Sequence, residues 1–194
     1  SDYLPAFKIA LKENQEEIKA ISENTETPTF QNTIEALEFS GKYLKRLQRI
    51  FYAVNGANTD DTLKAAAKEI TPALATHSDF INLNAKLYER VKAVYDQKDK
   101  LNLSAEETRL LEETHKRFVR AGISLKGEKQ DRLREINTRL AKLSGDFGEN
   151  LLDETNAFEY YTKDKNELGN LPESLVALAA EEAKKRGHDN GWSF

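Results

Sequence analysis

The chain contains no cysteine and no methionine, and only three histidines among its 194 residues. The lack of cysteine excludes a disulfide framework and a thiol nucleophile. It leaves the redox compartment open, and the cytoplasm is favoured over the periplasm. Because the chain begins at Ser1 without any methionine, we expect its natural start to lie upstream of this sequence.

An excess of positive charge and a long apolar run are also missing. Lys and Arg number 29 and Asp and Glu 33, which gives a net charge of −4 and no overall field that would attract nucleic acid or an anionic bilayer. The longest apolar runs, such as Leu175–Ala180, are much shorter than the roughly 18 to 20 residues that span a bilayer. Neither nucleic acid nor a membrane is therefore an expected partner.

The residue patterns of common hydrolytic centres are absent as well. A zinc protease helix of the H-E-x-x-H type places two histidines one turn apart around a glutamate, but His77, His115 and His188 each lack a second histidine four residues on. No G-x-S-x-G turn presents a serine nucleophile. Acidic pairs such as Glu106 and Glu107 are sequence neighbours that point apart on a helix. We therefore expect no catalytic, cofactor-binding or metal-ligating residue in this chain.

Two weaker patterns favour a structural role over ligand binding. Gly122–Lys129 has some features of a phosphate-binding loop, but Glu128 follows the second glycine where a lysine is required, and no strand precedes it. Tyrosine hydroxyls could contact a ligand, although a tyrosine at a helix edge more often packs its ring and leaves its oxygen in water. The tyrosines concerned are Tyr43, Tyr52, Tyr88, Tyr95, Tyr160 and Tyr161.

The sequence does contain apolar residues at spacings of three and four over most of its length, which is typical of amphipathic helices. With 39% hydrophobic and 32% charged residues, the chain is long enough to bury a core. We predict a single all-α domain over residues 1–194, a bundle of about seven helices. The first predicted helix ends near Glu23, the second covers Thr29–Val54, and the third starts at Asp61 and is kinked or ended by Pro72. The fourth runs from about Asn82 to Tyr95, and the fifth begins at a capping box of Ser104 and Glu107 and ends at Ala121. The sixth covers Lys126–Glu154 and the seventh Pro172–Gly187.

The strongest periodic pattern lies in the helix predicted over Lys126–Glu154, which is expected to be the longest element. Its apolar residues follow an almost unbroken heptad, and we predict that all of them except the last, Leu151, are buried. The residues of the heptad are Leu133, Ile136, Leu140, Leu143, Phe147 and Leu151.

Two short segments near the end of the chain favour strands. Phe158–Thr162 is rich in strand formers, and its only candidate partner is Gly191–Phe194. We predict that the two pair as a short antiparallel ribbon. We also expect that the second strand runs on past Phe194 in the natural protein, so that Trp192 is partly uncovered at a domain interface.

One segment carries a family resemblance. PTFQNTIEALEFSG, residues Pro28–Gly41, is here called the signature segment. It resembles the N-terminal signature of the thimet oligopeptidase and oligopeptidase A family of zinc metallopeptidases, closest to the bacterial peptidyl-dipeptidase branch. The resemblance continues, in the family's order, through ANTDDTL (57–63), ATHSDFINLNAKLYERVKAVY (75–95), ETHKRFVRAGISL (113–125), INTRLAKLSGDFGENLL (136–152) and LPESLVALAAEEAKKRG (171–187).

The resemblance implies a parent enzyme several times longer than this chain. In it, a helical N-terminal region forms one wall of a deep channel that admits short peptides, and zinc-activated water releases dipeptides from their C-termini. The family's zinc ligands and catalytic glutamate have no matching position here, so zinc is expected in the parent and the isolated chain is expected to be inactive. The implied partners are short peptides and the catalytic domain of the parent, which is expected to be a monomer.

The signature segment has two interpretations. In the structural one, Phe30, Ile34 and Leu37 dock the second helix and Gly41 lets another helix approach closely. In the other, Asn32 and Glu35 face the channel.

At the level of the whole chain, the alternative to a channel wall is a free-standing helical interaction module without an enzymatic parent. A downstream H-E-x-x-H in the natural reading frame would distinguish the two.

Overall fold

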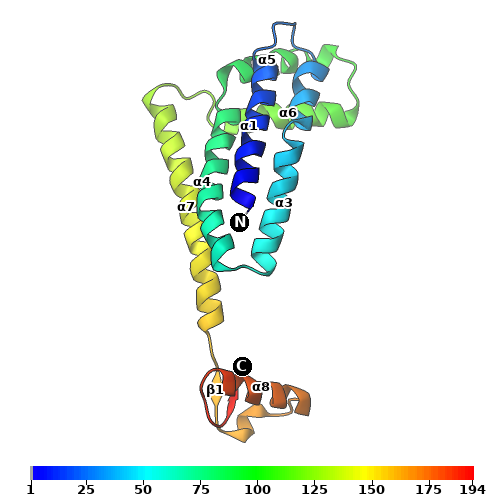
Figure 1. Cartoon of the computed structure of the whole chain (residues 1–194). Coiled ribbons are helices and arrows are strands. Elements are labelled where there is room, and N and C mark those ends of the chain that lie inside the picture. Colours follow the sequence, from blue (N-terminus) through cyan, green and yellow to red (C-terminus); the bar gives the residue numbers. More distant parts are fainter. Residues whose placement is uncertain (1) are drawn as a thin grey trace. The chain divides into compact units, whose positions relative to one another are not determined.

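The computed structural model describes residues 2–194, which form two compact units divided between Asp146 and Phe147. The fold is all-α with a two-stranded ribbon near the C-terminus, as predicted (Figure 1). That residues 1–194 act as one domain stays a prediction. The seven long helices are α1 (Tyr3–Ser22), α3 (Lys42–Ala57), α4 (Asp61–Asn82), α5 (Ala85–Tyr95), α6 (Ala105–Arg120), α7 (Glu128–Ala157) and α8 (Glu173–Lys185). The shorter elements are the π-helix η1 (Phe30–Glu35), α2 (Ala36–Phe39), the 3₁₀-helices η2 (Lys98–Lys100) and η3 (Lys165–Leu168), and the strands β1 (Tyr161–Thr162) and β2 (Trp192–Ser193).

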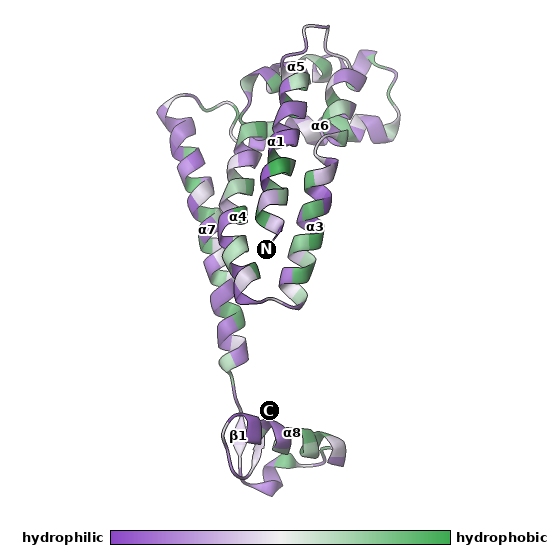
Figure 2. Cartoon of the chain, in the orientation of Figure 1, coloured by the Kyte–Doolittle hydropathy of each residue, from purple (hydrophilic) through white to green (hydrophobic). Residues whose placement is uncertain are grey.

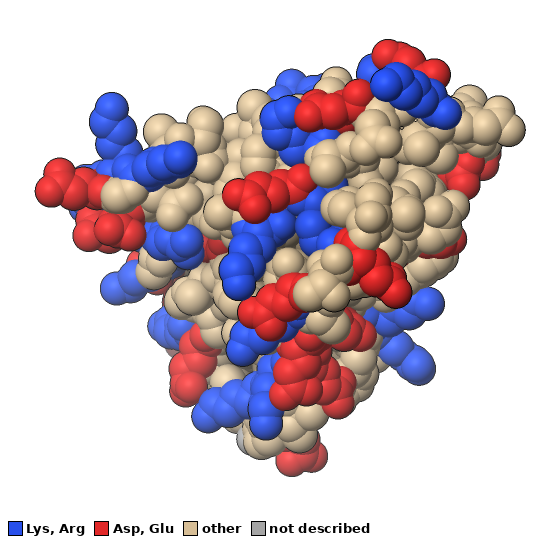
Figure 3. All heavy atoms as spheres, turned by 90° about the horizontal axis from the view of Figure 1, so that it is seen from above, with Lys and Arg blue, Asp and Glu red and all other residues tan. Residues whose placement is uncertain are grey.

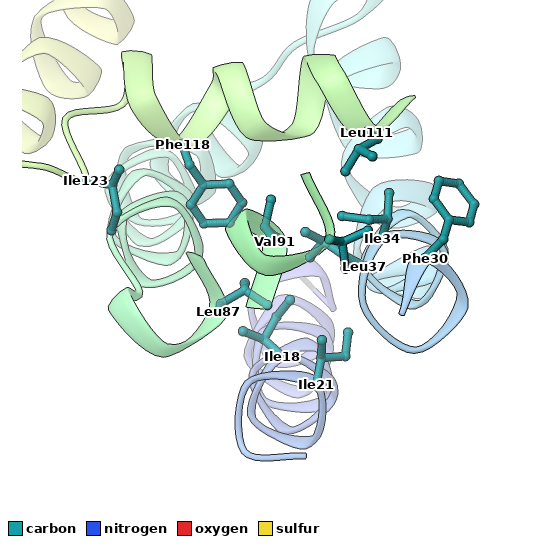
Figure 4. Close-up of a cluster of buried hydrophobic side chains, with 11 residues drawn as sticks. Ile18, Ile21, Phe30, Ile34, Leu37, Leu87, Val91, Leu111, Phe118 and Ile123 are labelled. Carbon is teal, nitrogen blue, oxygen red and sulfur yellow. The ribbon is translucent and has the colours of Figure 1, made fainter. Parts of the chain in front are cut away.

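The first unit is built around two buried clusters. One joins α1, η1, α2, α5 and α6, whose side chains converge in Figure 4, with Ile18, Leu87 and Phe118 completely buried. The other joins α1, α3 and α4 around Phe7 and Phe51. Burying a side chain of this size contributes about 1.5 to 3 kcal/mol, so these clusters hold the helices of the first unit together.

One predicted helix boundary was wrong, and one of the two alternatives predicted at Pro72 was also wrong. The helix expected over Thr29–Val54 is interrupted, because Ser40 is extended and Gly41 is left-handed at φ 66°. The Ser40 hydroxyl donates to the carbonyl of Leu37 at 2.7 Å and so ends α2. Conversely, Pro72 does not end α4, since buried residues on both sides of the proline, Ile70 and His77, hold its two halves in the core. The other alternative, a kink at Pro72, stays a prediction.

The predicted burial of the α7 stripe was also wrong. No residue of α7 is buried, although α7 is the longest helix, as predicted. Leu133 is half-buried beside Gly122, while the other predicted core residues of this helix are exposed. The exposed fractions are 39% for Ile136, 56% for Leu140, 51% for Leu143 and 69% for Phe147. Leu151, the last residue of the heptad, is 57% exposed. Periodicity defines which face of a helix is apolar but does not supply the element that covers it.

The second unit contains the ribbon. Strands β1 and β2 pair antiparallel, Tyr161 with Ser193 and Thr162 with Trp192. Tyr160 and Phe194 extend the pairing by two backbone hydrogen bonds of 3.0 Å each. The predicted pairing is therefore confirmed, and Trp192 is half-buried. Across residues 2–194, no helix combines the length and the apolar character needed to cross a membrane.

Candidate functional site

The signature segment connects helices of the first unit through buried side chains and backbone caps. Phe30, Ile34 and Leu37 are buried in the first cluster, which confirms the docking role predicted for them. Thr29 caps η1 in a reciprocal box: its hydroxyl accepts the Asn32 backbone N–H at 3.1 Å, and the Asn32 side-chain oxygen accepts the Thr29 N–H at 2.8 Å. The Asn32 amide also donates to the carbonyl of Thr27 at 3.0 Å. The polar atoms of Asn32 are therefore engaged within the chain.

Arg90 of α5 connects the signature segment and the loop before it to α5 by hydrogen bonds. The guanidinium donates to the carbonyls of Asn24 at 2.6 Å and Glu26 at 2.9 Å, and to the side-chain oxygens of Asn32 at 3.0 Å and Thr33 at 3.3 Å. Only 7% of Arg90 is exposed. A planar, permanently charged fork can satisfy several oxygens at once, so this single side chain orders the loop between α1 and η1.

A second polar network connects the end of the signature segment to α1 and α4. The Gly41 N–H donates to the Glu17 carboxylate at 2.6 Å, the Asn14 amide donates to the same oxygen at 2.9 Å, and the Asn14 oxygen lies 2.7 Å from His77 Nε2. A Cβ at Gly41 would lie 2.9 Å from the Asn14 oxygen. The predicted close approach at Gly41 is therefore confirmed, at a break between helices instead of within one.

The histidines do not fit a zinc site. His77 is buried against Asn14, His115 of α6 lies 3.2 Å from the Tyr88 hydroxyl, and His188 lies 3.0 Å from the Glu159 carboxylate. Burial lowers the pKa of both His77 and His115, which favours their neutral forms. Within residues 2–194, no cluster of three or more His, Cys, Asp or Glu is arranged to hold a metal ion.

A partly buried polar cluster supports the ribbon of the second unit. The Ser193 hydroxyl donates to Glu159 at 2.6 Å, and His188 approaches the same carboxylate oxygen while its ring stacks on Tyr161. The hydrogen bond from Ser193, together with the nearby His188, lowers the pKa of the Glu159 carboxyl. Because the serine donates to the carboxylate and not to the histidine, this is not the arrangement of a serine hydrolase.

The weaker patterns are structural too. Gly122 and Gly127 are left-handed, and Ser124–Lys129 borders an open surface depression, without the strand and lysine that a phosphate loop requires. Most of the tyrosine hydroxyls considered above bond within the protein: Tyr52 with Thr71, Tyr88 with His115, Tyr160 with Glu167 and Tyr161 with Asn190.

The apolar side of α7 is largely exposed. Figure 2 shows hydrophobic residues recurring along this helix between hydrophilic ones. A contiguous exposed apolar stripe of this kind is typical of an interaction surface. Sequence reasoning found the stripe but assigned it to the core, and it missed Arg90 and Glu159, whose partners are distant in sequence.

Comparison with known proteins identifies the family. Residues 7–130 match the model of the neurolysin/thimet oligopeptidase N-terminal domain. This chain belongs to that family. The family-model match covers the whole signature segment and the helices that Arg90 connects to it.

Three relatives are similar over almost the whole chain. The dipeptidyl carboxypeptidases of Escherichia coli and Salmonella typhimurium are 37% and 36% identical over 190 residues, 98% of this chain and 28% of each relative. The organellar oligopeptidase A of Arabidopsis thaliana is 32% identical over 189 residues, 96% of this chain and 23% of the relative. The chain thus spans between 23% and 28% of the length of these relatives and corresponds to the N-terminal domain of family peptidases.

Proposed function

We propose that this chain forms the N-terminal wall of the substrate channel in a zinc metallopeptidase that hydrolyses short peptides and releases C-terminal dipeptides. The observation that carries the proposal is the 37% identity with a dipeptidyl carboxypeptidase over 98% of the chain. The fold supports it, because the helices of the first unit pack around two buried clusters and polar groups such as Arg90 and His77 serve to hold them together.

Zinc belongs, on this proposal, to the part of the relatives that the chain does not match. The histidines of this chain lie apart, each with its own partner, and do not fit a metal. This chain would therefore bound the space in which a peptide lies and leave activation of water to groups outside it.

The catalytic part of the same protein is the proposed partner of the α7 stripe. Leu140, Leu143 and Phe147 are half or more exposed, and a stable interface between domains would cover such residues. The docking role of the partly uncovered Trp192 is part of the same proposal. A free-standing interaction module remains the alternative, but it does not account for the similarity to peptidases.

The proposal is tested on the protein encoded by the natural reading frame that contains this sequence. Incubated with an unstructured peptide, that protein should shorten it two residues at a time from the C-terminus, as mass spectrometry would show. A zinc chelator should stop the reaction, and added zinc should restore it. An encoded protein that leaves peptides intact in the presence of zinc would contradict the proposal.

A further inference from the structure

Helix α3 carries charge of one sign only. It contains Lys42, Lys45, Arg46 and Arg49 and no Asp or Glu, within a chain whose net charge is −4. The other long helices contain both signs. Figure 3 shows the same mixture over the face of the molecule in view, where Lys and Arg lie interspersed with Asp and Glu. The composition of α3 is therefore a local departure from the rest of the chain.

The four cations lie on one side of the helix. Their spacing of three, one and three residues is that of a single helical face. All four are exposed, whereas Leu44 and Phe51 on the opposite side are buried in the second cluster. Among residues 2–194, none of the four has a carboxylate within ion-pair distance. This charge is thus directed at solvent.

Within residues 2–194, no ion pair offsets the cost of this arrangement. Like charges three and four residues apart on a helix repel each other. Lys42 and Lys45 lie in the first turn, where the helix dipole disfavours cations, and the N-cap residue Gly41 offers no side-chain cap. Lys42 Nζ lies 4.5 Å over the ring of Phe39, and Lys45 Nζ donates to the carbonyl of Glu38 at 2.9 Å, but neither contact supplies a negative charge. An anionic partner would supply it.

An apolar border lies beside the cations. Phe39, Tyr43, Ile50 and Val54 are between 40% and 55% exposed, and the last three recur along one edge of α3. Aromatic and aliphatic groups next to lysine and arginine match a ligand that alternates carboxylates with apolar side chains. A bilayer or a nucleic acid matches less well, because it carries many more negative charges than a short peptide and is repelled more strongly by the net charge of −4 on the chain.

We propose that this face of α3, defined by Lys42, Lys45, Arg46 and Arg49 with the border of Phe39, Tyr43, Ile50 and Val54, binds acidic peptides. The inference rests on the proposed function, since it names a class of peptide that the peptidase would hold on its N-terminal domain. It assigns to α3 an anchoring role for glutamate-rich and aspartate-rich chains, away from the bond that is cleaved. The anchoring is electrostatic and therefore decreases with salt.

The test is a binding measurement on the 194-residue chain, which needs no catalysis. The probe is an acidic peptide of about ten residues that carries glutamate and phenylalanine, and its partner probe has every glutamate replaced by glutamine. Fluorescence anisotropy at low salt compares the unchanged chain with Arg46→Glu/Arg49→Glu and with Arg46→Lys/Arg49→Lys. Lys100→Glu/Lys126→Glu makes the same change in net charge at two exposed lysines outside α3.

The acidic probe should bind the unchanged chain and Arg46→Lys/Arg49→Lys. It should bind Arg46→Glu/Arg49→Glu at least about tenfold more weakly than the unchanged chain. The variant outside α3 should stay within about twofold of the unchanged chain, and the glutamine probe should bind to none of them. Equal weakening by both charge reversals, or no binding of the acidic probe, would overturn the inference. Tighter binding of DNA or of anionic lipid vesicles than of the peptide would overturn it as well. Because cleavage is not measured, these outcomes are independent of the test of the proposed function.

Discussion

At the scale of single residues, the first unit depends on polar side chains that act over long sequence distances. Arg90 reaches Asn24, which precedes it by 66 residues, and His77 reaches Asn14, which precedes it by 63 residues. Both side chains are buried, and each is left with one nitrogen that has no partner in the described structure, His77 Nδ1 and Arg90 Nε. Such groups tolerate little change, because a buried polar atom that loses its partner costs about 1 to 3 kcal/mol.

Replacement of Arg90 by methionine should lower the free energy of unfolding by about 2 to 4 kcal/mol, because the carbonyls of Asn24 and Glu26 lose a charged donor. The stability of Arg90→Lys should lie between that of the unchanged chain and that of Arg90→Met, since lysine keeps the charge without the planar fork. Urea unfolding measures the change. Lys86→Met is the control, because its contact with Glu23 is long and exposed, and it should change stability by less than about 0.5 kcal/mol. Equal effects of the two methionine variants would refute the anchoring role of Arg90.

Histidine burial predicts a loss of stability in mild acid. The pKa of His77 is lowered by burial, so the unfolded chain takes up a proton as the pH falls below the ordinary histidine value of 6.5 while the folded chain does not. The free energy of unfolding should therefore fall from pH 7 downwards, until the lowered pKa of the folded state is reached. His77→Gln removes this titration, so urea unfolding at a series of pH values should show a shallower dependence in that variant. An unchanged slope would show that His77 is not the origin.

At the scale of secondary structure, local signals were reliable and long-range ones were not. The capping box of Ser104 and Glu107, the cap at Thr29 and the pairing of Phe158–Thr162 with Gly191–Phe194 are all present, since each depends on neighbouring residues or on the only available strand. The break at Gly41 was missed because the apolar stripe continues across it. The burial of α7 was predicted wrongly because a heptad shows that one face of a helix is apolar, but not whether these 194 residues contain an element that covers that face.

The exposure of the α7 stripe predicts that truncating one of its leucines destabilises the chain less than truncating a buried leucine. Leu140→Ala should change the free energy of unfolding of this chain by less than about 0.5 kcal/mol, because the side chain is more than half exposed. Leu111→Ala, at a completely buried position of α6, should cost about 2 to 5 kcal/mol. Chemical unfolding of the two variants side by side measures the difference. Similar costs for both would mean that the α7 stripe is covered in solution.

At the scale of the whole molecule, the chain belongs to a peptidase family but matches only 28% of the length of its dipeptidyl carboxypeptidase relatives. Its own residues explain how the helices of the first unit are assembled around two buried clusters. Within residues 2–194, His77 and His115 are engaged with separate partners, and the cluster around Glu159 secures a ribbon. The central claim is therefore that the chemistry of this protein lies outside residues 1–194.

Zinc titration of the 194-residue chain by calorimetry tests that claim most directly. A catalytic zinc site is held by three protein ligands in a fixed arrangement, and the described residues do not provide one. We predict that the chain takes up no stoichiometric zinc, whereas the protein from the full reading frame binds the metal tightly. A tight, stoichiometric zinc site in the 194-residue chain, accompanied by cleavage of peptides, would contradict the account.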